Sequence, residues 1–145
     1  MTYHFYGHDV ALTFNNPAFP YIHTPRDLYD ALDSLWCEYT CAPRLRHKWS
    51  EQDKTVGQCS ITAFLVQDIC GGEVYGILRP DGNHHCYNVV DGYVFDLTSE
   101  QFHDEVLDYS DNPKQSRDVH FSKKEKKKRY DYLKTCFYNK YSCQA

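Results

Sequence analysis

Apolar residues recur with helical spacing in the segment that follows Thr24 and Pro25. Thr24 is a good N-terminal cap and Pro25 suits a first helical turn, so these two residues mark a helix start. One apolar stripe then runs through Leu28, Ala31, Leu32, Leu35, Trp36 and Tyr39. Because the stripe keeps a helical period, the pattern predicts a helix that ends before Pro43.

The segment 58–70 is apolar on nearly all sides of a helix, which is typical of a buried central helix. The pair Gly71-Gly72 directly after it is a strong helix stop. Strands are predicted after this stop, at 73–78, 84–90 and 93–98. A dense turn signal at 79–83 and the hairpin dipeptide Asp91-Gly92 separate them.

The C-terminal segment 122–141 returns to helical spacing. Its apolar stripe consists of Tyr130, Leu133, Phe137 and Tyr141. The pattern predicts a helix over 123–138, with Ser122 and Glu125 in capping-box spacing. The cationic run 123–129 lies in its first turns, where the helix dipole disfavours positive charge. We interpret this run as a solvated face; a docking face for an anionic partner is the alternative.

The remaining segments carry weaker patterns. Residues 1–23 are rich in aromatic residues, Asn and Pro, which predicts irregular chain packed down by its rings, and 10–14 is compatible with a short strand. The stretches 44–56 and 108–115 predict loops, the first of which begins with a basic patch. A short helix is predicted at 99–102.

The totals suit one domain over residues 1–145, because 41% of the residues are hydrophobic and 16% are aromatic. We expect an α+β fold in which segment 49–102 supplies a central buried helix packed on an antiparallel sheet of three or more strands. The N- and C-terminal helices flank this core.

Charge and cysteine content narrow the class of protein. The formal charge of −4 gives no reason to expect binding to nucleic acid or to an acidic membrane. The N-terminus lacks the features of a secretory signal, and no stretch approaches the roughly 20 apolar residues of a membrane helix. With an odd number of cysteines, 7, the chain is predicted to be cytoplasmic with reduced thiols.

The hairpin register offers a test of which residues share a face. A two-residue turn at 91–92 makes His85 and Asp96 diagonal neighbours on one face, within reach of a hydrogen bond. His84 points the opposite way, and a slip of one residue exchanges the two histidines. The pair is interpreted either as a solvated surface pair or as an imidazole whose tautomer the carboxylate fixes.

Cys59 lies where the central helix begins, and a helix N-terminus and a nearby imidazolium both favour a thiolate. The catalytic interpretation makes Cys59 a nucleophile with His85 as its base; the alternative is a structural cysteine. Gly57 leaves room for a substrate near the backbone. The candidates for oxyanion or substrate contacts are Gln58, Trp49, Ser60 and Asn88.

A metal site is the other chemical interpretation of the cysteines and histidines. It would use Cys59 and the His84-His85-Cys86 run, or the pair Cys37 and Cys41. Because neither CxxC nor HxxxH spacing occurs, we expect no metal, and no phosphate-binding or dinucleotide-binding motif points to a cofactor.

Several motifs in a fixed order carry a resemblance. They are Gly57-Gln58-Cys59-Ser60 with the following helix through Asp68, Gly71-Gly72-Glu73, His85-Cys86-Tyr87-Asn88, Asp91-Gly92 and 96–102. Over roughly 49–102 the chain resembles the YunG-like family of uncharacterised bacterial proteins. More loosely, the order of a helix-borne Cys, a strand His and a following Asp is similar to transglutaminase-like and papain-like cysteine enzymes. That resemblance implies a papain-like or transglutaminase-like core, with Cys59 as nucleophile, His85 as base and Asp96 as orienting residue.

The predicted function is therefore thiol-dependent acyl hydrolysis or transfer on a small-molecule or peptide substrate that the sequence does not identify. The alternative is a non-enzymatic binding module that retains the fold with a silent triad. A binding module predicts that Cys59 lies away from any cleft, or that His85 is out of its reach.

Overall fold

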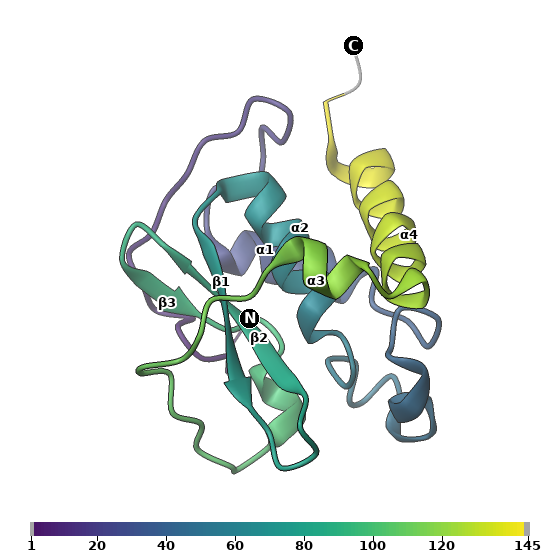
Figure 1. The fold of residues 1–145 in the computed structure, drawn as a ribbon. Coiled ribbons are helices and arrows are strands. Elements are labelled where there is room, and N and C mark those ends of the chain that lie inside the picture. The colour runs from purple at the N-terminus through teal and green to yellow at the C-terminus, as the bar shows by residue number, and fades with distance from the viewer. Residues whose placement is uncertain (1, 144–145) are drawn as a thin grey trace.

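The computed structural model describes residues 2–143, and Figure 1 shows an α+β arrangement in which a small sheet lies beside a group of helices. The helices are α1 (Pro25–Asp33), α2 (Cys59–Cys70), α3 (Arg117–Phe121) and α4 (Lys124–Tyr141), with the 3-10 turns η1 (Pro43–Lys48) and η2 (Ser99–Phe102). The strands are β1 (Glu73–Leu78), β2 (His84–Val90) and β3 (Tyr93–Phe95). Among residues 2–143, no helix has the length and apolar character needed to cross a membrane.

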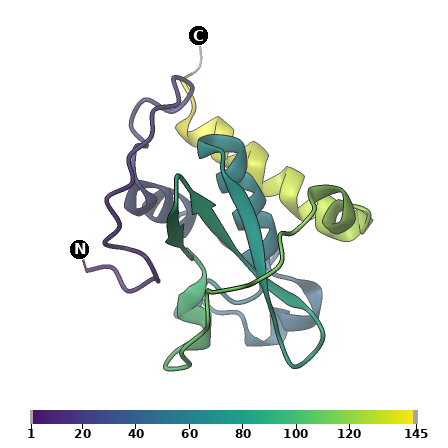
Figure 2. The ribbon, with the colours of Figure 1, turned by 60° about the vertical axis from the view of Figure 1, so that its left-hand side comes forward.

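Helix α2 lies between the sheet and α4 (Figure 2). It is buried over most of its length, as its apolar sequence predicts, and Ile61, Phe64, Leu65 and Val66 are at most 1% exposed. The core is completed by Phe19, Leu32 and Trp36 from the N-terminal part, and by Leu133 and Phe137 of α4. The prediction of a central buried helix on an antiparallel sheet is confirmed.

The sheet has the order β1-β2-β3, and all of its pairs are antiparallel. The hairpin register is as predicted where β3 exists: Val90 pairs with Tyr93, and Asn88 pairs with Phe95. The prediction that β3 reaches residue 98 is wrong, because β3 ends at Phe95. The pairs predicted between 85–87 and 96–98 therefore do not form, and this part of β2 has no strand beside it on the β3 side among the described residues.

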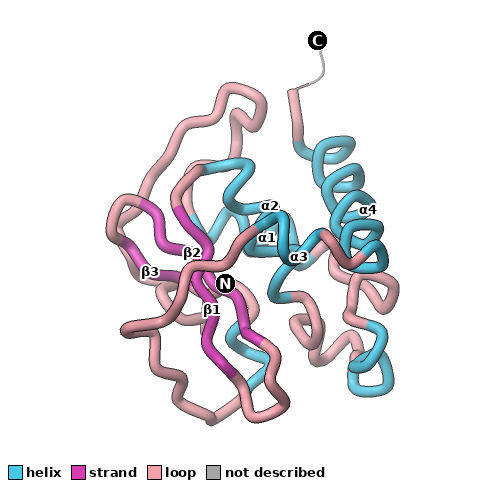
Figure 3. Tube along the Cα trace, in the orientation of Figure 1, coloured by secondary structure: helices cyan, strands magenta, loops and turns pink. Residues whose placement is uncertain are grey.

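The chain leaves the sheet at Asp96 because this residue finds other partners. Its backbone N–H donates to Tyr6 O at 2.9 Å, and its side chain accepts from Thr98 N at 3.2 Å. Ser99 N donates to Asp96 O at 3.2 Å, which turns the chain into η2. Figure 3 shows the loops that carry η1 and η2 at the lower end of the molecule, near the start of α2.

The first helix is shorter than predicted, since α1 ends at Asp33. The apolar stripe continues beyond it because turns, not a helix, bury Trp36, whose indole donates to Thr62 Oγ1 at 2.9 Å. The Thr40 hydroxyl accepts from Cys37 N at 3.0 Å and holds the turn that replaces the last helical residues.

The C-terminal helix departs from prediction at its start. The capping box is wrong, because Lys123 occupies the N-cap position and makes no side-chain cap. Glu125 instead pairs with the buried Arg129, whose guanidinium donates to Thr40 O at 2.9 Å. The short α3 was not predicted; its signal is Ser116, which caps Val119 N.

The N-terminal segment is irregular, as predicted, but the described chain has no strand at 10–14. Phe5 and Phe19 are fully buried and pack it against the core. The basic residues 44–48 form most of η1 and not a loop. The loops predicted at 49–56 and 108–115 contain no helix, and each makes only isolated bridges.

Candidate functional site

Cys59 is the first residue of α2, and the helix start leaves its backbone donors uncapped. Gln58 occupies the N-cap position without making a side-chain cap, so the N–H groups of the first turn have no intrahelical acceptor. Cys59 is partly exposed and lines a cleft of about 500 Å³ together with Ser60. A thiol in this position receives the positive end of the helix dipole and is open to a ligand.

His85 and Asp96 form a buried pair beside this helix start. His85 Nε2 lies 2.6 Å from Asp96 Oδ2, and the two side chains are 2% and 1% exposed. His84 does not take part, in agreement with the predicted register. The ring of Phe102 packs edge-on against the imidazole, with 4.6 Å between centroids. The solvated surface pair is therefore excluded for these two residues.

The carboxylate of Asp96 is held by further donors. The hydroxyl of Tyr109 donates to Asp96 Oδ2 at 2.7 Å, and Thr98 N donates to the other oxygen. Sequence reasoning did not identify Tyr109, because it lies in a segment whose polar composition indicates only a loop. Because Asp96 accepts from Nε2 of His85, the other ring nitrogen, Nδ1, is the one left to interact with the Cys59 thiol.

The thiol of Cys59 and the imidazole of His85 are close enough to change each other's ionisation. Interaction with the Cys86 thiol lowers the pKa of Cys59 most; burial opposes this, and His85 and the Cys86 backbone N–H lower it further. Burial lowers the pKa of His85, but Asp96 and Cys59 outweigh it and raise the pKa to about 10. The arrangement favours a thiolate–imidazolium pair at neutral pH.

Cys86 also belongs to the site, and sequence reasoning considered it only as a metal ligand and as part of the motif at 85–88. Its thiol is buried against Cys59, and hydrogen bonding to the Cys59 sulfur raises the pKa of Cys86 well above its ordinary value. The hairpin register could have indicated Cys86, because it places Cys86 on the face of β2 opposite to His85. The face that carries Cys86 and Asn88 is the one that packs on α2. Since β3 stops early, the edge of β2 at 85–86 is left open to Cys59.

The predicted oxyanion and substrate candidates fall into two groups. Gln58 donates to Cys37 O at 3.2 Å, Trp49 donates to Lys54 O at 3.0 Å, and Asn88 donates to Ala63 O at 2.9 Å. These three side chains support the fold and line neither of the clefts next to Cys59 and His85. Ser60 does line the Cys59 cleft. The remaining candidates for binding an oxyanion are therefore the backbone N–H groups of Cys59 and Ser60, in the first turn of α2.

Gly57 lines the Cys59 cleft, and the fold also requires a glycine at this position. Gly57 has a φ of 71°, and a Cβ atom there would lie 2.5 Å from the Cys41 sulfur and 2.9 Å from Ala42 N. The missing side chain therefore avoids a clash with the protein's own chain; that it also leaves room for a substrate stays a prediction.

Two clefts meet at this end of the molecule. The first contains Cys59, and the second, of about 530 Å³, is lined by His85 and Phe102. Both are lined by Arg44, Asn83 and His84. Among the residues that the structure describes, no group of three or more His, Cys, Asp or Glu side chains is placed to hold a metal ion. The arrangement is suited to nucleophilic thiol chemistry at the junction of the two clefts.

Comparison with known proteins gives a family and one relative. The YunG protein family matches residues 24–142. The chain is 34% identical over 90 residues to "Uncharacterized protein YunG" of Bacillus subtilis (strain 168), a match that covers 62% of this chain and 75% of the relative. No solved structure matches the chain. Because the family match includes Cys59, His85, Cys86 and Asp96, the candidate site lies within it, and the chain belongs to the YunG family.

Proposed function

We propose that this protein is a thiol-dependent acyl hydrolase or acyltransferase that works through an acyl-cysteine intermediate. The observation that carries the proposal is the Cys59 thiol at a helix start, on a cleft, beside the buried His85–Asp96 pair. The substrate is an amide or an ester, since both offer a carbonyl carbon to a thiolate and a leaving group that accepts a proton.

The proposed reaction has two halves. The Cys59 thiolate attacks the carbonyl carbon, the N–H groups of Cys59 and Ser60 bind the oxyanion, and the His85 imidazolium gives its proton to the leaving amine or alcohol. Water, or a second acceptor, then gives a proton to neutral His85 and attacks the acyl group, which releases the thiolate and restores the imidazolium. Asp96 accepts from Nε2 throughout and orients Nδ1 toward the sulfur.

A papain-like or transglutaminase-like core belongs to the same proposal. The chain order of helix-borne Cys59, β2 His85 and the following Asp96 supports it, as does the packing of α2 on an antiparallel sheet. One difference is the His–Asp spacing of 11 residues, which is tighter than is usual in transglutaminases.

A binding module with a silent triad is the competing function. It predicts Cys59 away from any cleft, or His85 out of reach. The exposure of Cys59 to a cleft and the lowered pKa of its thiol favour the enzyme.

Alkylation by iodoacetamide tests the proposal without a known substrate. The rate at Cys59 is measured by peptide mass spectrometry, with exposed Cys143 as the internal reference thiol. At neutral pH, Cys59 is expected to react faster than Cys143, and His85→Ala is expected to slow Cys59 by about tenfold or more, since one pKa unit is a factor of ten. Equally slow labelling of Cys59 in the two proteins would contradict the proposal.

A further inference from the structure

One wall of the Cys59 cleft carries a lysine that the reaction above does not use. Lys126, on the first turn of α4, lines this cleft and is partly buried. Its Nζ lies 2.9 Å from His120 Nδ1, and His120 Nε2 lies 2.8 Å from Gln115 Oε1. Because an amide oxygen only accepts, His120 carries its proton on Nε2, and its Nδ1 accepts from the ammonium.

Gln115 and His120 form a hydrogen-bonded relay that holds Lys126, and both of these side chains are uncharged. Gln115 Nε2 donates to Pro113 O at 3.3 Å, which orients the amide. Burial and the charge of Lys126 lower the pKa of His120 to about 4, so the imidazole is uncharged at neutral pH. The relay therefore fixes the Lys126 ammonium in place without neutralising it.

The other charges on this cleft are mostly compensated. Arg44 lies 3.0 Å from Asp81, and the buried Arg129 pairs with Glu125. Across the described chain, Lys126 has no carboxylate oxygen within 4.0 Å, and neither does the exposed Lys123. Since Glu125 is the only acidic side chain in the lining, the wall facing Cys59 is cationic.

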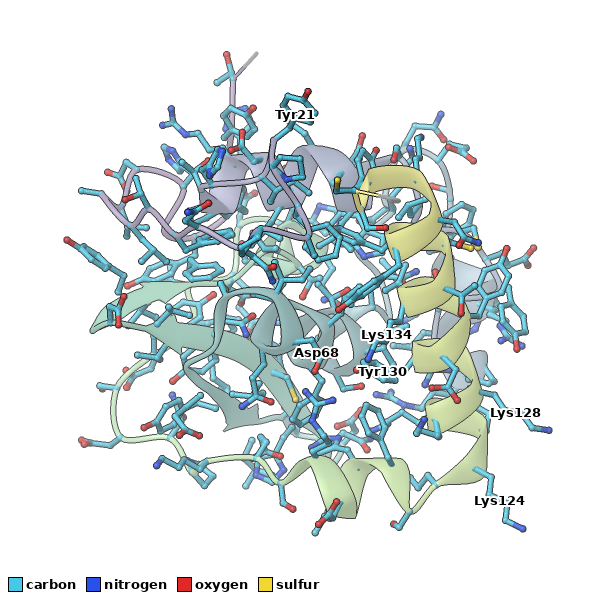
Figure 4. The ribbon with its side chains drawn as sticks, turned by 90° about the horizontal axis from the view of Figure 1, so that it is seen from above. Tyr21, Asp68, Lys124, Lys128, Tyr130 and Lys134 are labelled. Carbon is cyan, nitrogen blue, oxygen red and sulfur yellow. The ribbon has the colours of Figure 1, made fainter. Side chains whose placement is uncertain are left out.

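Neighbouring lysines on α4 differ from Lys126. Figure 4 shows Lys124 and Lys128 extending from the outer side of the helix. Lys127 pairs with Asp131. Lys126 and Cys59 line the same cleft. Burial lowers the pKa of Lys126, whereas the charge of the Cys59 thiolate raises it. The solvated-face interpretation of the cationic run thus applies to Lys124 and Lys128 and not to Lys126.

We propose that the substrate of Cys59 carries a carboxylate, and that Lys126 binds it through an ion pair beside the scissile amide or ester. This inference rests on the proposed acyl chemistry and adds the substrate class to it. A single oriented ammonium matches a monoanion, and a cleft of about 500 Å³ suits a small acyl group. Exposed Lys123 adds positive charge at the edge of the cleft and favours the approach of an anion.

Two alkylating reagents of similar size test this inference. Iodoacetate carries a carboxylate and iodoacetamide does not, and both attack the same thiolate, so the ratio of their rates at Cys59 cancels any change in thiol ionisation. Each rate is divided by that of Cys143 in the same sample. The wild-type ratio is expected to favour iodoacetate, and Lys126→Gln to lower it about threefold to fivefold, the effect of a modest ion pair.

Matched variants separate charge from structure. Glutamine keeps a donor for His120 Nδ1, Lys126→Arg keeps the charge and should retain the ratio, and Lys128→Gln removes a solvated charge and should leave it unchanged. In the wild-type protein, succinamate, a monoanion, should slow iodoacetamide labelling of Cys59 more than the neutral diamide succinamide does. This measurement requires no variant to fold.

The outcomes also distinguish the two proposals. Rapid iodoacetamide labelling of Cys59 with the same reagent ratio in wild type and Lys126→Gln overturns the carboxylate inference and leaves the acyl chemistry in place. Equal protection by succinamate and succinamide overturns it as well. Slow labelling of Cys59 by both reagents, at the rate of Cys143, overturns both proposals.

Discussion

Two polar clusters lie at opposite ends of α2, and they differ in whether their charges are matched. At the C-terminal end, Asp68 lies 2.8 Å from Arg117 and 3.7 Å from Lys134, and the Tyr130 hydroxyl donates to it. Figure 4 shows Asp68, Tyr130 and Lys134 gathered between α2 and α4. At the N-terminal end, the Lys126 ammonium contacts neutral His120 and has no carboxylate partner among the described residues.

The difference indicates that the Asp68 cluster stabilises the fold, whereas the Cys59 end is arranged to bind a ligand. Buried polar groups that serve the fold normally find partners, because an unmatched group costs free energy. The Asp68 cluster follows that rule and ties α3 and α4 to α2. The Cys59 end departs from it at Lys126, a partly buried ammonium without a carboxylate partner that lines the same cleft as the Cys59 thiol. A charge without a counter-charge on the wall of a cleft is the pattern expected of a site for a ligand.

The largest expected effect on Cys59 labelling comes from breaking the buried His85–Asp96 pair at the N-terminal end of α2. In Asp96→Asn, the His85 imidazolium loses its carboxylate, so its pKa falls from about 10 and the thiolate loses its counter-ion at neutral pH. Labelling of Cys59 by iodoacetamide should slow by roughly tenfold or more. An unchanged rate in a folded variant, verified by circular dichroism, would remove Asp96 from the site.

A smaller effect is expected from Cys86→Ala. This change removes the thiol that contributes most to the lowered pKa of Cys59. One lost hydrogen bond corresponds to about 1 kcal/mol, so the thiolate fraction at a pH well below the Cys59 pKa should fall about fivefold. The pH at half-maximal labelling is the measurement. Cys70→Ala serves as the control, because it removes a cysteine on the same helix away from the cleft.

A substitution in the Asp68 cluster, at the C-terminal end of α2, should change stability and not the reactivity of Cys59. Tyr130 is 3% exposed, and Tyr130→Phe removes the hydroxyl that joins Asp68 and Arg117. The free energy of unfolding in urea should fall by about 1–2 kcal/mol. Labelling of Cys59 in the folded variant should stay at the wild-type rate; a slower rate would mean that the two ends are coupled.

The sequence was informative where the pattern was local. The apolar run of α2 and the Asp91-Gly92 turn predicted the central helix and the hairpin register, and the register in turn placed His85 against Asp96. Residues that meet through long-range folding gave no such signal. Tyr109 reaches Asp96 from a loop, and Lys126 turns inward from a run of lysines because His120 and Gln115 on other segments hold it.

The end of β3 at Phe95 also depended on distant contacts. The pattern predicted a strand to residue 98, yet Asp96 pairs with Tyr6, 90 residues earlier in the sequence. The alternation of side chains along a strand carries no information on whether Asp96 pairs with β2 or with a distant residue such as Tyr6. The same shortening exposes the β2 edge where Cys86 meets Cys59, so the missed detail is part of the site.

The pH dependence of Cys59 alkylation tests the central claim most directly. Cys59 is expected to lose its proton well below the ordinary value of 9.0, and His85 is expected to keep its proton up to about 10. The ion pair thus exists between these two pH values, and iodoacetamide labelling should already be rapid at neutral pH, with a second change near pH 10 that His85→Ala removes. A single rise centred near pH 9, unchanged in His85→Ala, would contradict the account.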